Sequence, residues 1–151
     1  MVLTPIKTTL RSNVQRATQV WTGIGAQVST MTHEAHDGAF AAVSHLPHLL
    51  AFAFMNGIAG QESGKLFLEL AGPGFRDFSR IAAGDPTMWR DVLLANRAQV
   101  LRQSQAFRQA LDQMEALMSA GDAAALEQAI GAASQLRGQW RLGSSTESPD
   151  A

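Results

Sequence analysis

The chain has 151 residues, 46% of them apolar and 17% charged, and its formal net charge is −1. This length suits one domain with its own core, and the absence of a basic excess excludes most nucleic-acid binders. The lack of cysteine excludes a disulfide framework and thiolate chemistry. We expect a cytoplasmic protein, and the low charge content favours a chain that buries part of its surface against a partner.

Two further classes of protein are not expected. The glycines form no GxGxxG or P-loop motif, and the nearest approach, Gly72-Pro73-Gly74, lacks a preceding strand. The longest apolar stretch, from Leu46 to Met55, is too short to span a bilayer. The N-terminus shows no signal pattern. The sequence therefore predicts neither a nucleotide site of its own nor a membrane protein.

The N-terminal residues predict a strand–helix–strand unit. The strands are expected over residues 2–5 and 26–30, and the helix over residues 8–21, ended by Gly23 and Gly25. Two short strands are marginal without a larger sheet. The unit therefore resembles the edge of a sheet whose remainder lies elsewhere.

From Thr32, a plausible N-cap, the chain is expected to be helical. A helix over residues 33–55 contains Pro47, which has no N–H to donate to the carbonyl of Val43 and whose ring presses against that carbonyl. The sequence predicts a kink or break there. The freed carbonyl would lie beside two histidines, in a position to line a polar pocket.

The remaining segments are also expected to be helical. A looser stretch at 57–64 and a helical turn or two at 66–70 precede a stop at 72–74 and a short helix at 75–83. Asp85 and Pro86 are a strong helix start.

The helix that starts at Pro86 is expected to continue to Met118, roughly 50 Å at about 1.5 Å per residue. It carries an incomplete heptad pattern. Its length relative to a small domain makes packing between molecules at least as plausible as packing within the chain. A last helix is expected over residues 123–140, and the polar residues 143–151 predict a disordered tail.

All four histidines fall within sixteen residues, at positions 33, 36, 45 and 48. As a metal site, they would form two i,i+3 pairs close enough to share an ion, although Pro47 disturbs the second pair. As structural residues, one or two would be satisfied core histidines. As a ligand site, imidazoles at a kinked helix would hydrogen-bond an anion. All three interpretations remain open.

An anion site needs a cation, and Arg76 and Arg80 lie four residues apart on one predicted helix face, with Asp77 beside them. The guanidinium is a planar fork suited to carboxylates. The alternative is a solvated helix with an Asp77–Arg80 pair that contributes under about 1 kcal/mol.

Several segments occur together in the order seen in prephenate dehydrogenases, the NAD-dependent enzymes of tyrosine biosynthesis, to which cyclohexadienyl and arogenate dehydrogenases are closely related. The chain resembles this family over roughly residues 1–120. The segments are His36-Asp37, residues 44–53, residues 74–82, residues 85–91 and Asn96.

The resemblance implies a mainly α fold, a helical dimerisation domain with long intertwined helices, preceded by a strand–helix–strand remnant of a Rossmann domain. The implied domains are 1–31, the edge of the nucleotide-binding domain, and 32–142, the dimerisation and substrate-binding domain, followed by the tail 143–151. NAD or NADP would bind the full enzyme and not this piece alone, which we expect to be inactive because the nucleotide domain is missing.

The family oxidises and decarboxylates prephenate or arogenate. The resemblance implies a homodimer in which His48, Arg80, His45 and Gly74 bind substrate, with Arg80 holding a carboxylate. Ser44 would lie near the nicotinamide. Asp77 and Trp89 would orient or gate the substrate site. His36 and Asp37 would support it. It implies no metal and no catalytic residue in this part of the enzyme.

Two other functions stay open. The first is a histidine-rich metal-binding helical protein, and the second is a purely structural dimeric helical module. They differ from the dehydrogenase in whether purified protein holds stoichiometric metal, and in whether changes at His48 and Arg80 affect a partner enzyme.

Overall fold

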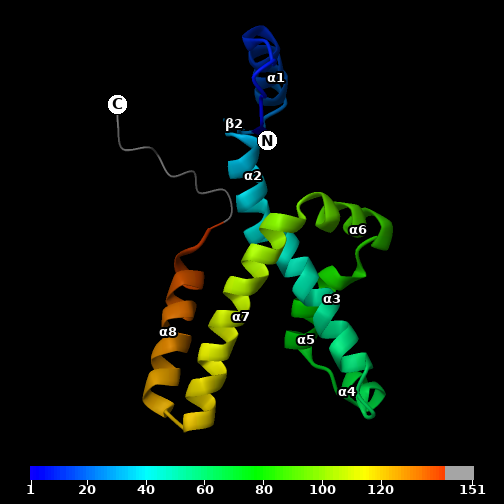
Figure 1. Cartoon of the computed structure of the whole chain (residues 1–151), viewed down its shortest axis with the longest axis vertical. Coiled ribbons are helices and arrows are strands. Elements are labelled where there is room, and N and C mark those ends of the chain that lie inside the picture. The colour runs from blue at the N-terminus through cyan, green and yellow to red at the C-terminus, as the bar shows by residue number, and fades with distance from the viewer. Residues whose placement is uncertain (142–151) are drawn as a thin grey trace. The chain divides into compact units, whose positions relative to one another are not determined.

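The computed structural model describes residues 1–141 (Figure 1). The chain forms two compact units, Met1–Gln105 and Ala106–Ala151, and each is described by itself. Helices dominate both, which confirms the predicted mainly α class. The predicted tail, residues 143–151, lies outside the described residues.

The first unit begins with the predicted strand–helix–strand. Strand β1 (Val2–Leu3) and strand β2 (Ser29–Thr30) are parallel, with Val2 opposite Ser29, and helix α1 (Arg11–Gly23) connects them. The helix starts three residues later than predicted and ends before Gly25, whose φ of 86° is the left-handed conformation that glycine tolerates best.

A continuous helical run follows, made of α2 (His33–Phe40), the π-helical segment η1 (Ala41–His45) and α3 (Leu46–Ala59). Thr32 caps it as predicted, because its Oγ1 accepts from the Ala35 N–H at 3.2 Å. The sequence predicted a kink or break at Pro47, and the run does not break there. The chain instead widens to a π turn, in which the Leu46 N–H donates to the Ala41 carbonyl, and Pro47 enters the first turn of α3.

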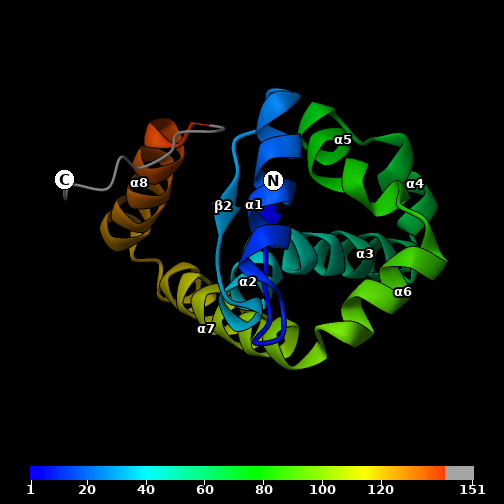
Figure 2. The same cartoon turned by 90° about the horizontal axis from the view of Figure 1, so that it is seen from above.

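Helix α3 is the centre of the first unit, with three short elements packed along it (Figure 1, Figure 2). These are α4 (Gly64–Glu69), α5 (Pro73–Ser79) and the 3-10 turn η2 (Arg80–Ala83). The sequence predicted a stop at 72–74, but Pro73 opens α5 because proline suits a first helical turn.

The predicted helix from Pro86 to Met118 is wrong as a single element. It is divided into α6 (Pro86–Ala95) and α7 (Arg97–Ala120), with Asn96 between them at φ −106° and ψ 27°. The start was predicted correctly, since the Asp85 carboxylate accepts from the Met88 N–H at 2.7 Å. The side chain of Asn96 makes hydrogen bonds to the His33–Ala59 helical run, and these accompany the break.

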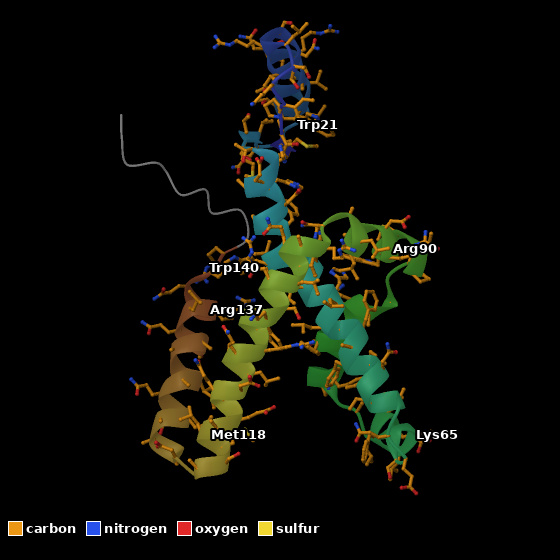
Figure 3. All side chains as sticks on the ribbon, in the orientation of Figure 1. Trp21, Lys65, Arg90, Met118, Arg137 and Trp140 are labelled. Atoms are coloured by element: carbon orange, nitrogen blue, oxygen red, sulfur yellow. The ribbon has the colours of Figure 1, made fainter. Side chains whose placement is uncertain are left out.

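The second unit contains the C-terminal part of α7 and helix α8 (Ala123–Gln139), which the Asp122 carboxylate caps through the Ala125 N–H at 3.0 Å. Figure 3 shows Arg137 and Trp140 near the end of α8, where the guanidinium carbon lies 5.1 Å from the centre of the indole ring. Large apolar side chains stay exposed along both helices. They are Phe107, Leu111, Met118, Ile130, Leu136 and Trp140.

Few apolar side chains are fully enclosed in the described part of the chain. Those that are belong to the first unit: Ala41, Leu46, Ala51 and Val100. So much uncovered apolar surface is typical of a chain that buries it against another molecule or domain.

The run from His33 to Ala59 has 27 residues and is, by length and composition, apolar enough to cross a membrane. The prediction from Leu46–Met55 alone underestimated its length. The central helix of a helical domain has the same properties. The packing of α4, α5 and η2 along α3 favours that second interpretation.

Candidate functional site

The histidine cluster meets helix α6 through Trp89. The imidazole of His48, on α3, stacks on the indole of Trp89 with ring centres 3.6 Å apart and planes 22° apart. His45 and Phe52 meet the same indole edge-on, at 6.4 and 6.2 Å. Trp89 therefore holds together one end of the π-helical segment and the start of α3, two of whose histidines were predicted site residues.

The tautomer of His48 follows from its partner. Nδ1 of His48 lies 2.9 Å from the carbonyl oxygen of Ser44, and a carbonyl only accepts hydrogen bonds. Nδ1 therefore carries the hydrogen, and Nε2 of the neutral ring is left with a lone pair. The sequence predicted a freed carbonyl beside the histidines, but at Val43 and not at Ser44.

His45 is held by the residue that divides α6 from α7. The amide nitrogen Nδ2 of Asn96 lies 2.8 Å from the Asp37 carbonyl oxygen and 3.2 Å from Nδ1 of His45. Burial lowers the pKa of His45, and the nearby His36 and His48 lower it further, while Asp37 raises it. His45 is therefore biased toward its neutral form.

His36 and Asp37, the two predicted supporting residues in α2, are in contact with each other. Nδ1 of His36 lies 3.0 Å from Oδ1 of Asp37, and the His36 ring stacks on Phe40 at 4.3 Å. Asp37 thus contacts His36 through its carboxylate and Asn96 through its backbone carbonyl. His33 is separate from this group and contacts Glu34 at 3.1 Å on the surface.

The predicted cation, Arg80, is the first residue of η2, and η2 packs against α3, the helix that carries His48. Its guanidinium is exposed and has no hydrogen-bond or ion-pair partner within residues 1–141. The predicted Asp77–Arg80 pair is wrong, because Asp77 accepts from Nε of Arg76 at 3.1 Å. Gly74 lies in the first turn of α5, exposed.

A hollow of about 420 Å³ lies beside Trp89, between α3 and the η2–α6 connection, and a second of about 330 Å³ shares Phe52 and Ala82 with it. Trp89 is the predicted site residue in the larger hollow, and His45, His48 and Arg80 are not part of its lining. The lining residues are Phe52, Ala82, Gly84, Pro86, Trp89, Arg90 and Leu93.

Gly84 leaves room for the indole of Trp89. A Cβ at this position would lie 2.5 Å from Nε1 and 2.7 Å from Cδ1 of Trp89, far inside van der Waals contact. We therefore expect Gly84→Ala to lower the free energy of unfolding by about 1 to 3 kcal/mol through overpacking. Urea unfolding followed by tryptophan fluorescence measures this.

The matched control is Gly57→Ala in α3, where a Cβ would meet nothing within 4 Å. Alanine there is expected to stabilise by roughly 0.5 to 1 kcal/mol, since glycine is unfavourable inside a helix. Equal stability of the two variants would show that Trp89 does not need the space at Gly84.

The four histidines do not converge on one point. In the described part of the chain, no group of three or more His, Asp or Glu side chains is placed to hold a metal ion. His45 and His48 instead use ring nitrogens for the Asn96 amide and the Ser44 carbonyl. The geometry therefore gives the metal-binding alternative no ligand set.

These features define a class: a helical domain, built around one π-interrupted helix, that carries a histidine–tryptophan cluster and an arginine without a partner in the described residues. Residues 32–132 match the family described as prephenate dehydrogenase, dimerization domain. The chain belongs to this family.

Individual relatives agree. The chain is 32% identical over 123 residues to the prephenate dehydrogenase of Bacillus subtilis, covering 81% of this chain and 33% of that protein. It is similar to the structure of prephenate dehydrogenase from A. aeolicus in complex with hydroxyphenyl propionate and NAD+, with a TM-score of 0.84, 34% identity, and coverage of 90% of this chain and 48% of that one.

A second solved structure, Synechocystis arogenate dehydrogenase, has a TM-score of 0.82 and 31% identity, and the match covers 93% of this chain and 51% of that one. The chain thus spans about a third of the length of the curated relatives it matches.

Sequence reasoning missed two residues of this site and gave a third no role. Gly84 received no role and Phe52 was only part of an apolar run, although Gly84 leaves room for the indole of Trp89 and Phe52 meets it edge-on. Asn96 was noted only as part of the resemblance. An asparagine inside an apolar heptad pattern was the available signal, since it is a weak helix former.

Proposed function

We propose that this chain is the dimerisation and substrate-binding part of an NAD(P)-dependent dehydrogenase that oxidises and decarboxylates prephenate or arogenate. The observation that carries the proposal is the packing of η2, which starts with the unpaired Arg80, against α3, which carries His48 and its stack on Trp89. A substrate with carboxylates needs a cation and hydrogen-bonding side chains in the same site.

The residue roles follow from chemistry and position. Arg80 offers an uncommitted guanidinium to a carboxylate, and His48 and His45 offer hydrogen bonds to substrate oxygens. Trp89 orients His48, and Asn96 joins the Asp37 carbonyl to His45. Ser44 fixes the His48 tautomer through its carbonyl, a role in addition to the proposed place near the nicotinamide.

The proposed places of Gly74 and Asp77 are in the substrate site, both on α5 immediately before Arg80. Asp77 is committed to Arg76, which leaves Arg80 unpaired. In this arrangement Asp77 has an orienting role on α5 and does not neutralise the Arg80 guanidinium that would bind the substrate.

The residues present do not fit a nicotinamide dinucleotide. Residues 4–10, which follow β1, contain no glycine, so the close backbone approach that a pyrophosphate requires is missing there. We propose that a nucleotide-binding domain supplies NAD or NADP, and that residues 1–31, with β1, α1 and β2, are the C-terminal edge of that domain. The helical domain is then residues 32–142. The chain alone is expected to be inactive.

We also propose a cytoplasmic homodimer that binds neither membrane nor nucleic acid. The exposed apolar side chains of α7 and α8 and the family's description as a dimerization domain support the dimer. The net charge of −1 shows none of the basic excess that is typical of nucleic-acid binders.

Calorimetric titration of the full chain with prephenate, and separately with arogenate, tests the function. We expect weak, saturable binding of at least one of the two, which diminishes at high salt because an exposed cation is screened. Failure of both ligands to bind at millimolar concentration would contradict the proposal.

A further inference from the structure

Asn96 contacts two groups that differ in chemistry. One is the Asp37 carbonyl, at 2.8 Å from the amide nitrogen, and the other is Nδ1 of His45, at 3.2 Å from the same atom. Since a carbonyl oxygen only accepts, the amide atom facing Asp37 has to be the nitrogen. The orientation of the Asn96 amide is therefore fixed by a partner other than the histidine.

The Asn96 nitrogen has two hydrogens. One is used by the Asp37 carbonyl, and the other points to His45 only if Nδ1 of His45 has a lone pair. A hydrogen on Nδ1, whether in the neutral ring or in the imidazolium, would place two donors against each other. The hydrogen of His45 is therefore on Nε2, which has no partner within residues 1–141.

His48 has the opposite arrangement. Its Nδ1 is 2.9 Å from the Ser44 carbonyl and carries the hydrogen, so Nε2 keeps a lone pair while the ring is neutral. Both rings contact Trp89, at 6.4 Å for His45 and 3.6 Å for His48. Two neighbouring histidines thus present a donor and an acceptor.

We propose that Asn96 is a positioning residue that holds His45 as the neutral Nε2–H tautomer, so that the His45–His48 pair offers one hydrogen-bond donor and one acceptor to the ligand. The use of this pair by a substrate rests on the proposed function. The tautomers themselves do not, and they can be measured without any ligand.

The ionisable groups around His45 come from two elements. His36 and Asp37 belong to α2 and His48 to α3, and the two histidines and Asp37 act on His45 in opposite directions. Asn96, which comes from the α6–α7 junction, is uncharged. Its effect is therefore on which nitrogen holds the hydrogen, and it opposes protonation of Nδ1 at any pH at which the contact persists.

Two-dimensional ¹H–¹⁵N spectra of the histidine rings in the full chain test this, with resonances assigned from His45→Gln and His48→Gln. We expect His45 to show an unprotonated Nδ1 and His48 a protonated Nδ1 near neutral pH. A His45 ring with its hydrogen on Nδ1 would overturn the proposal, and this reading needs no variant of Asn96.

Asn96→Asp then separates positioning from general structure. The carboxylate accepts instead of donating, so Nδ1 of His45 is expected to gain a hydrogen and the ring to titrate at higher pH. The matched control is Asn13→Asp in α1, an exposed residue that adds the same charge. An Asn96→Asp titration of His45 no different from that of Asn13→Asp would overturn the proposal.

The two proposals fail in different ways. If the tautomers are as inferred but neither prephenate nor arogenate binds, the positioning role stands and the dehydrogenase function fails. If a ligand binds and His45 holds its hydrogen on Nδ1, the function stands and the role of Asn96 fails.

Discussion

Replacing Arg80 with alanine is expected to lower kcat/KM for the proposed substrate at least about 100-fold, or ~2.7 kcal/mol, in the proposed dehydrogenase assembled with a nucleotide-binding domain. The reason is that Arg80 is exposed and has no partner of its own within residues 1–141, so its guanidinium is available to a substrate carboxylate. Steady-state kinetics of purified wild type and variant measure the effect, and circular dichroism checks the fold.

The control for this prediction is one turn away on the same segment. Arg76→Ala removes an exposed arginine whose Nε already donates to Asp77 at 3.1 Å, and it is expected to change kcat/KM by less than about threefold. Arg80→Lys should recover only part of the loss, because an ammonium lacks the planar fork. An Arg80→Ala enzyme with wild-type kcat/KM would remove Arg80 from the site.

A glutamate in place of Leu111 on α7 is expected to weaken the homodimer at least about a hundredfold in Kd. Leu111 is 43% exposed in the single chain and is one of the large apolar side chains along α7 and α8 that stay exposed in the second unit. Burying an unpaired carboxylate in their place costs several kcal/mol. Sedimentation equilibrium should show wild type at twice the chain mass of 16.2 kDa, and the variant shifted toward one chain.

Gln113→Glu provides the matched charge on the same helix. Position 113 is two residues from Leu111, a rotation of about 200°, and is already polar and exposed. The control should remain a dimer. A wild-type chain that sediments as a folded monomer would contradict the proposed assembly, and a dimeric Leu111→Glu variant would place the interface elsewhere.

Helix starts were predictable because they depend on neighbouring residues. Thr32, Asp85 and Asp122 each accept from the backbone N–H three residues on, at 3.2, 2.7 and 3.0 Å. Capping of this kind requires only a short side chain and a free N–H. Those positions could therefore be identified from local sequence.

The division at Asn96 was not predictable in the same way. The incomplete heptad pattern continues on both sides of it, and the hydrogen bond that accompanies the break reaches the Asp37 carbonyl, 59 residues away in the sequence. The π turn before Pro47 was likewise not predictable from the sequence. A missing N–H indicates that the hydrogen-bond pattern changes, but not that a π turn absorbs the change.

The site was predictable as a set of residues and not as an arrangement. The motifs indicated His45, His48, Arg80 and Trp89, but the stack of His48 on Trp89 joins α3 to α6 across a gap of 41 positions. The pairing of Asp77 with Arg76, in place of Arg80, depends on side-chain geometry in α5 that the spacing alone leaves open.

The π turn at Ala41–His45 also sets how the residues after it are rotated about the helix axis relative to the residues before it. A π turn is equivalent to one extra residue in an α-helix, so it rotates everything after it by about 100° relative to everything before it. The Asn96 amide depends on that rotation, because the same nitrogen contacts Asp37 before the turn and His45 at its end. Deleting one residue between them would restore an ordinary helix and turn the two groups out of reach of a single amide. The number of residues in the π turn therefore sets how Asp37 and His45 are oriented relative to each other. The length of this segment is as constrained as its side chains.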